Sequence, residues 1–135
     1  MAHRISAGAL VLREEKILLV RHHRTGRHDF WVGPGGGVEG GETLEATAER
    51  ETLEESGVTI KVRRLAYLDE LWSDTEIDVT ANPAESESII EANWFARDQL
   101  PSGHLFPEPL RDRFWSDLQT GFAAPIKLPL RRLHF

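Results

Sequence analysis

Residues 36–58, which read GGVEGGETLEATAERETLEESGV, decide the fold of this chain of 135 residues. They hold seven glutamates and one cation, Arg50, and so account for the whole formal net charge of −6. Outside this stretch, 15 acidic residues are balanced by 15 basic ones. Acidity confined to one short segment indicates a local site rather than a uniformly acidic surface.

A helix is expected over residues 43–56, which contain strong helix formers and neither glycine nor proline. Gly40 and Gly41 precede the segment. Gly57 follows it and suits the left-handed conformation that often ends a helix. The sequence therefore predicts one helix of about four turns here.

Three glutamates of this helix, Glu51, Glu54 and Glu55, are spaced at i, i+3 and i+4 and therefore share one face. Like charges at this spacing oppose helix formation. Mg²⁺ or Mn²⁺ would relieve the repulsion, because both cations prefer several oxygen ligands and are commonly shared with substrate phosphates. Zinc fits poorly, since no histidine lies at helical spacing beside these glutamates.

The glycines at positions 35, 36, 37, 40 and 41 allow the backbone before the helix to approach a ligand closely. Their carbonyl oxygens could complete a metal shell, and their N–H groups could hold an anion together with the helix N-terminus. Taken singly, a glutamate-rich helix is more often a solvated surface, and a glycine cluster is more often a tight turn. The two features at a fixed spacing favour a binding site.

Most of the remaining chain is patterned for extended structure, with a second helix near the end. Strands are expected at residues 4–12, 16–22, 29–32, 58–71, 76–80 and 89–96, a glycine-rich loop at 33–37 and a helix near 108–119. The first two strands are expected to form a hairpin. This order predicts a single domain over residues 1–135, an α/β (α+β) sandwich with a mixed sheet. The packing of the tail at 125–135 stays open.

The composition excludes several classes of protein. The absence of cysteine excludes disulfides, thiolate nucleophiles and cysteine-based metal sites. No apolar run approaches the roughly 18 residues of a membrane span, and no signal peptide precedes the first strand, so a cytoplasmic location is expected. The acidic balance argues against binding in a DNA or RNA groove. A phosphate-handling protein of this charge would need a metal.

Gly36, Glu42 and the run from Arg50 to Val58 are spaced so that residues 36–58 resemble the box of the Nudix hydrolases. The flanking residues 30–39 and 91–100 also resemble that family, so the resemblance covers residues 4–100. The one departure within the box is Thr52, where the family prefers an aliphatic side chain. Threonine adds a hydroxyl that the packing of the helix must satisfy.

The resemblance implies a Nudix-like α/β/α sandwich with a central mixed β-sheet. It also implies an enzyme that uses Mg²⁺ or Mn²⁺ to hydrolyse the phosphoanhydride bond of a nucleoside diphosphate linked to another group. The implied metal ligands are Glu51, Glu54, Glu55 and the carbonyl of Gly36, and the implied catalytic residues are Arg50, Glu51 and Glu54. The general base stays open among the box glutamates and Glu85, Glu87 and Glu91.

The substrate side chains must come largely from outside the helix. The residues expected around the substrate are Arg21, Arg24, Gly37, Glu42 and Glu87. Both arginines follow the second strand and could reach phosphates, whereas Glu42 would brace the loop against the helix. His22, His23 and His28 lie nearby in the sequence, and a surface position is more typical of each than contact with substrate.

The identity of the substrate stays open, because segments typical of subgroups are absent. There is no downstream proline of the ADP-ribose type, no tyrosine at the diadenosine polyphosphate spacing and no Ser-Gln-Pro-Trp-Pro-Phe segment of the NADH type. A nucleotide-type small molecule is the expected partner, and a homodimer is a hypothesis. Thr52 and the short segment after Trp72 leave a second hypothesis, a nucleotide-binding sensor with little turnover. A DNA-binding regulator is a weaker third.

Overall fold

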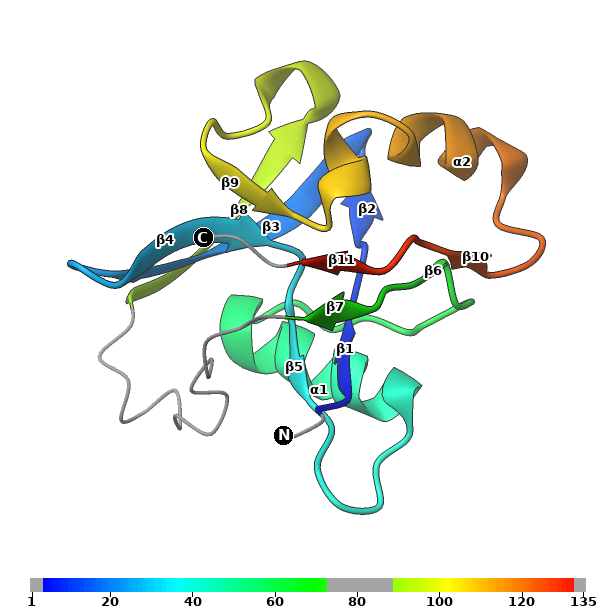
Figure 1. The fold of residues 1–135 in the computed structure, drawn as a ribbon, viewed down its shortest axis with the longest axis horizontal. Coiled ribbons are helices and arrows are strands. Elements are labelled where there is room, and N and C mark those ends of the chain that lie inside the picture. Colours follow the sequence, from blue (N-terminus) through cyan, green and yellow to red (C-terminus); the bar gives the residue numbers. More distant parts are fainter. Residues whose placement is uncertain (1–3, 73–88, 133–135) are drawn as a thin grey trace.

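The computed structural model describes residues 4–72 and 89–132 and has an α+β fold around a mixed five-stranded sheet (Figure 1). The elements are β1 Ser6–Gly8, β2 Leu12–Arg13, β3 Lys16–Arg24, β4 His28–Val32, β5 Gly35–Gly37, α1 Leu44–Ser56, β6 Tyr67–Leu68, β7 Leu71–Trp72, β8 Ile89–Ala96, η1 Arg97–Gln99, β9 His104–Phe106, η2 Glu108–Arg111, α2 Phe114–Thr120, β10 Ile126–Lys127 and β11 Arg131–Arg132. This architecture confirms the predicted fold class.

The central sheet is organised around β3. Strand β8 pairs antiparallel with one edge of β3, while β2 and β4 pair antiparallel with the two ends of its other edge. Strand β9 extends the sheet parallel to β4. The four residues 17–20 of β3 are all at most 1% exposed, because both faces of this part of the sheet are covered.

The glycine segment predicted as a loop contains a strand instead. Strand β5 pairs antiparallel with β1, and Gly36 lies opposite Ala7. A Cβ atom on Gly35 would lie 2.6 Å from the carbonyl oxygen of Ala7, so the missing side chain permits this close pairing. The predicted first strand is therefore divided, since β1 pairs with β5 and only β2 joins β3 in the expected hairpin.

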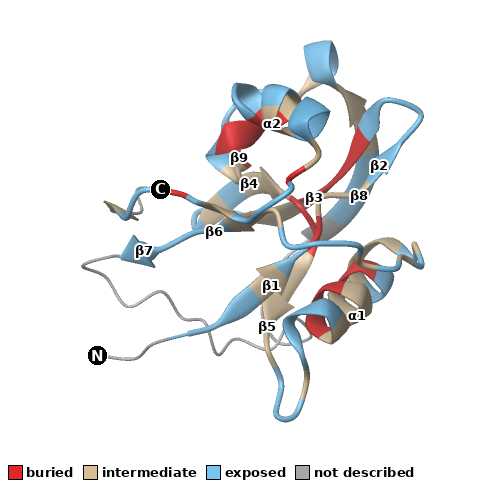
Figure 2. Cartoon of the chain, turned by 90° about the vertical axis from the view of Figure 1, so that its right-hand side faces the viewer, coloured by how far each residue is buried: buried red, intermediate tan, exposed pale blue. Residues whose placement is uncertain are grey.

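The second predicted helix is also divided. A 3₁₀ helix, η2, and the shorter α2 are separated at Asp112, whose φ of −140° and ψ of −89° leave the helical region. Both segments still supply core residues, because Leu110 and Phe114 pack with Ile17 and Leu105. Figure 2 shows buried residues on β3 and beside α2, and a second group on α1. Strand β9, which carries Leu105, was not predicted.

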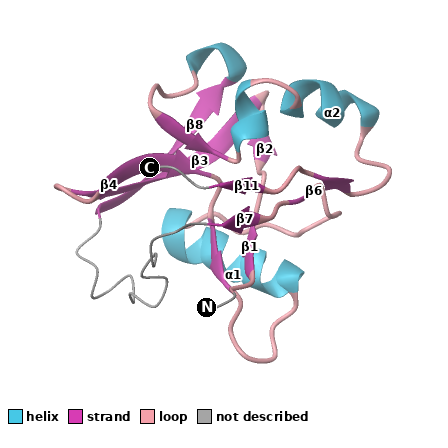
Figure 3. Ribbon diagram, in the orientation of Figure 1, coloured by secondary structure: helices cyan, strands magenta, loops and turns pink. Residues whose placement is uncertain are grey.

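The strand predicted over residues 58–71 is reduced to the short β6 and β7 (Figure 3). Within the described part of the chain, residues 58–66 have no neighbouring strand with which to form a ladder. Strands β6 and β7 pair in parallel with β10 and β11, so the tail lies beside residues 67–72. The strand expected at 76–80 lies outside the described residues. No helix in the two described ranges is long and apolar enough to cross a membrane.

Candidate functional site

Helix α1 begins and ends within one residue of its predicted bounds. Thr43 caps the N-terminus, because its Oγ1 accepts a hydrogen bond from the N–H of Ala46 at 3.1 Å. Gly57 ends the helix in the left-handed conformation, with a φ of 76°. The helix packs against β1 and β5 (Figure 1), which brings the glutamates of α1 next to the glycines of β5.

Thr52, the departure from the family pattern, lies on the buried face of α1 and is fully buried. Its hydroxyl donates a hydrogen bond to the carbonyl oxygen of Ala48 at 2.7 Å. The buried hydroxyl of Thr52 therefore has a hydrogen-bond partner within α1. The helix is continuous through this position.

Arg50 joins the glycine segment to the carboxylates of α1. Its Nε and Nη2 donate to the two oxygens of Glu42 at 2.8 and 2.9 Å. Its Nη1 donates to Glu51 at 2.8 Å and to Glu54 at 3.2 Å, and Nη2 also donates to the carbonyl of Gly37 at 3.3 Å. The Arg50 guanidinium holds the pKa of the Glu42 carboxyl well below its ordinary value, at about 2.

The three carboxylates expected to bind metal occupy different environments. The Glu54 side chain is 58% exposed, that of Glu51 is 15% exposed and that of Glu55 is 7% exposed. Burial raises the pKa of Glu51, and the charge of Glu55 raises it further, against the opposing effect of Arg50. A Cβ atom on Gly36 would lie 2.6 Å from the carboxyl carbon of Glu51, so a glycine at this position makes room for that carboxylate.

Glu55 is held from two sides. The N–H of Gly35 donates a hydrogen bond to its Oε1 at 2.8 Å. The Nε2 of His22, on β3, lies 3.1 Å from its Oε2. The His22 imidazole in turn stacks on the ring of Phe30 in β4, with centroids 5.2 Å apart and planes inclined by 15°. Glu55 therefore links α1 to both β5 and the central sheet.

These donors fit a hard divalent cation by their chemistry. Carboxylate and backbone oxygens are the ligands that Mg²⁺ and Mn²⁺ prefer, and the missing side chain of Gly36 lets the Glu51 carboxylate lie against the backbone of β5. Within the described ranges, no three His, Cys, Asp or Glu side chains already converge as a metal cluster. Arg50 bonds one oxygen each of Glu51 and Glu54, so a cation would use their second oxygens, and the carboxylates would have to move closer together to share it.

Arg21 is not brought to these carboxylates. Arg21 and His22 are consecutive on β3 and therefore point to opposite faces of the sheet. Arg21 donates to both carboxylate oxygens of Asp29 at 2.8 Å, and it lies 3.7 Å from Glu91. The expected phosphate contact and one candidate base thus pair with each other on the face away from Glu55.

The other residues expected around the substrate have varied positions. Arg24 is at the end of β3, on the face that carries His22. Gly37 offers its carbonyl to Arg50, and the guanidinium of Arg4 lies where a Cβ atom of Gly37 would point. Glu85 and Glu87 lie outside the described residues.

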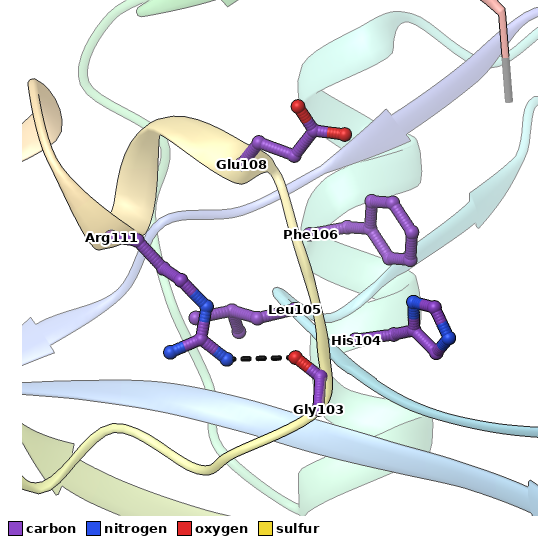
Figure 4. A pocket seen from close by; sticks show the side chains of 6 residues that line it. All are labelled: Gly103, His104, Leu105, Phe106, Glu108 and Arg111. Atoms are coloured by element: carbon purple, nitrogen blue, oxygen red, sulfur yellow. Dashed lines mark hydrogen bonds between the residues drawn. The ribbon is translucent and has the colours of Figure 1, made fainter. Parts of the chain in front are cut away.

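Two hollows border β9. The smaller, of about 210 Å³, is lined by Gly103, His104, Leu105, Phe106, Glu108 and Arg111. Figure 4 shows Arg111 on the opposite side of β9 from His104 and Phe106, donating a hydrogen bond of 2.8 Å to the carbonyl of Gly103. The larger, of about 360 Å³, has Arg21, Asp29 and Trp31 in its wall. The residues that line these hollows include none from α1, so we assign neither hollow to the carboxylate site.

Comparison with known families agrees with this geometry. A family model described as the NUDIX domain matches residues 2–115. The chain belongs to the Nudix hydrolase family. Residues 36–58 are accordingly its Nudix box, and the helix that carries the box glutamates is α1.

Two curated Nudix relatives are longer than this chain. The NAD-capped RNA hydrolases NudC of Salmonella heidelberg and Salmonella typhi are each 41% identical to it over 111 residues. Each match covers 73% of this chain and 40% of the relative. The chain therefore spans less than half the length of these relatives.

Solved structures of the family share the fold. A Nudix hydrolase from Nitrosomonas europaea has a TM-score of 0.65 and 20% identity, covering 96% of this chain and 78% of that one. A UDP-X diphosphatase has a TM-score of 0.62 and 22% identity, covering 93% of this chain and 68% of that one. At these identities the similarity shows the Nudix fold alone.

His22 is the site residue that sequence reasoning undervalued. The sequence places it beside His23, and no local pattern separates the two histidines. Strand alternation alone could have shown that they face opposite ways. Which of them meets Glu55 depends on how β3 lies against α1, and this is a tertiary property.

Proposed function

We propose that this Nudix chain hydrolyses the phosphoanhydride bond of a nucleoside diphosphate linked to another group, with Mg²⁺ or Mn²⁺ as its cofactor. The observation that carries the proposal is the way in which the three glutamates are held: Arg50 bonds Glu51 and Glu54, and the N–H of Gly35 in β5 bonds Glu55. A carboxylate-rich site without a metal would repel a polyphosphate, so the cation is part of the proposal.

In this proposal Glu51, Glu54 and Glu55 hold the cation, together with the carbonyl of Gly36. The bound cation would neutralise phosphate oxygens and lower the pKa of a water molecule. The chain contributes orientation, because Arg50 ties the α1 carboxylates to Glu42 and Gly35 fixes Glu55.

Glu54 is the carboxylate that we propose as general base. It is the most exposed of the three, and the hydrogen bond from Arg50 is to its Oε2, which leaves Oε1 to bind the cation or to accept a proton. Glu91 suits this role less well, because it lies beside Arg21 on the other face of the sheet.

The printed names of the relatives, together with the sequence, support a proposal for the substrate class. By name, the NudC relatives act on NAD-capped RNA, and one solved neighbour acts on UDP-X. A nucleotide-linked diphosphate is common to these names, and we propose it for this chain. The absent Ser-Gln-Pro-Trp-Pro-Phe segment argues against simple transfer of the NudC substrate, so NAD⁺ and capped RNA belong in the test as members of a wider panel.

The test is product release from NAD⁺, NAD-capped RNA, ADP-ribose, UDP-sugars and dNTPs in the presence of Mg²⁺ or Mn²⁺. We expect turnover of at least one compound and a fall of at least about 100-fold in Glu54→Gln, since even partners outside the metal shell typically contribute 10–100-fold. Glu45→Gln is the matched control, because Glu45 is an exposed glutamate in the first turn of the same helix. Equal activity in Glu54→Gln and the wild type would refute the assignment.

A nucleotide-binding sensor remains the alternative, because Arg50 holds Glu51 and Glu54 in the described arrangement. Tight nucleotide binding by calorimetry without product from any member of the panel would select the sensor. The cytoplasmic location and the homodimer stay predictions, and a light-scattering mass tests the second.

A further inference from the structure

We infer that His22 is a positioning residue that orients the Glu55 carboxylate towards the divalent cation. The inference rests on the metal site of the proposed function, but it concerns a residue outside the Nudix box and outside the residues expected around the substrate. His22 would act through Glu55 rather than on the substrate.

The first argument is the way in which Glu55 is anchored. Its side chain is 7% exposed, its Oε1 accepts from the N–H of Gly35 at 2.8 Å, and its Oε2 lies 3.1 Å from His22 Nε2. Each carboxylate oxygen has two lone pairs, so both oxygens keep capacity for a cation after these contacts. A carboxylate anchored at both oxygens loses less conformational freedom when it binds a metal.

The second argument is that His22 is itself fixed. Its ring stacks on Phe30 at 5.2 Å, and the Phe30 ring meets Phe106 edge-on at 5.9 Å. The path from Phe106 through Phe30 and His22 to Glu55 crosses β9, β4 and β3 and ends on α1. The packed rings on the central sheet therefore orient the Glu55 carboxylate of α1, as outer-shell partners commonly orient metal ligands.

The third argument is the contrast between Glu55 and the other two ligands. Arg50 bonds Glu51 and Glu54 through one oxygen each, at 2.8 and 3.2 Å, so neither is anchored at both oxygens as Glu55 is. Glu55 has no such contact with Arg50 among the described interactions. It can therefore serve as the fixed ligand around which the other two rearrange.

The test is a Mn²⁺ titration followed by electron paramagnetic resonance, with no substrate present. His22→Leu should weaken Mn²⁺ binding by about 10–100-fold, the usual effect of losing an outer-shell partner. His22→Gln should recover part of this loss, because the glutamine amide reaches about as far as the imidazole Nε2. His23→Leu is the control, since His23 is the adjacent histidine on the opposite face of β3, and it should leave Mn²⁺ affinity unchanged.

A double-mutant cycle separates positioning from a general effect on folding. In a Glu55→Gln background, His22→Leu should no longer change Mn²⁺ affinity, because the carboxylate that it orients is gone. At saturating Mn²⁺, His22→Leu should recover most of the wild-type turnover with an unchanged KM for nucleotide. A raised KM under those conditions would assign His22 to the substrate and overturn the inference.

Unchanged Mn²⁺ binding by His22→Leu would also overturn the inference. Tighter binding would overturn it as well, because it would show that His22 competes with the cation for Glu55. The binding measurement needs no turnover. A wild-type protein that binds Mn²⁺ but hydrolyses nothing would refute the proposed function, and the His22 variants would still decide the inference. Wild-type turnover together with His22→Leu affinity equal to that of the wild type would refute the inference alone.

Discussion

The two faces of the central sheet differ in what they bury. On the face towards α2, Ile17 and Leu19 of β3 join Leu105 and Phe114 in an apolar core. On the other face, Leu18 and Val20 are equally buried, but the next side chain in that row is His22, which contacts Glu55. Both rows pass from apolar to polar side chains along β3, but towards α2 the next side chain is Arg21, which bonds Asp29, whereas towards α1 it is His22, which contacts a glutamate of the Nudix box.

Because of this difference, we expect substitutions on the two faces to affect different properties of the protein. Apolar burial is the main favourable term in folding, so substitutions on the α2 side should act on the free energy of unfolding. Substitutions around α1 should act on metal binding and turnover, because charged groups near water contribute little to stability. Four substitutions test this separation.

Phe114→Ala should have the largest effect on stability. Phe114 is 1% exposed and its ring contacts those of Trp115 and Phe122 at 5.0 and 6.3 Å. Removing a buried phenylalanine costs about 3–5 kcal/mol, which urea denaturation would measure. The milder Phe114→Leu keeps the test possible if the alanine variant does not fold. Loss of Mn²⁺ affinity in the folded leucine variant would contradict the separation of the two faces.

Gly36→Ala should lower turnover without unfolding the protein. The new Cβ would meet the end of the flexible Glu51 side chain at 2.6 Å, so the carboxylate must move but the backbone need not. A displacement of about 1 Å at a reacting centre can cost about 100-fold in turnover. The control is Gly40→Ala, because a Cβ at Gly40 meets nothing within 4 Å. Equal activity in the two variants would show that the position of Glu51 is unimportant.

Thr52→Val tests the buried face of α1. The substitution removes the hydrogen bond from the Thr52 hydroxyl to Ala48 and restores the aliphatic side chain that the family prefers. We expect the free energy of unfolding to fall by about 0.5–1.5 kcal/mol, the net contribution of an ordinary hydrogen bond. Turnover should be unchanged. A large fall in turnover would mean that Thr52 tunes the carboxylate face.

Asp117→Asn should have the smallest effect, and only over part of the pH range. Hydrogen bonds from Arg113 and Tyr67 lower the pKa of Asp117 below its ordinary value of 3.8. Because the folded pKa is the lower one, the carboxylate stabilises the fold fully above pH 3.8 and loses that contribution as the pH falls through the folded pKa.

Urea denaturation at pH 7 and at pH 2 checks this prediction. The wild type should be the more stable protein at pH 7, by a small margin because water competes with exposed ion pairs. The margin should shrink at pH 2. A difference between the two proteins that is the same at both pH values would show that the ionised carboxylate is not the cause.

Local patterns predicted a large part of the fold. The bounds of α1, its caps and strands β3, β4 and β8 follow from residues that lie close in sequence. The pairing of β1 with β5 and the presence of β9 did not follow, because short glycine-rich or three-residue strands are defined by partners far along the chain. The break at Asp112 was missed for a similar reason, since core packing of Leu110 and Phe114 overrides helix propensity there.

The charged helix and the common face of Glu51, Glu54 and Glu55 follow from the amino-acid sequence, because helical spacing is a local property. The neighbours that these glutamates contact depend on the tertiary structure. The pleat of β3 turns His22 towards Glu55 and Arg21 towards Asp29, and the β1–β5 pairing brings the Gly35 N–H to the same carboxylate. Successive side chains of a strand point to opposite faces of the sheet. Which set faces α1 depends on the register of the strand with distant strands, so local sequence does not fix it.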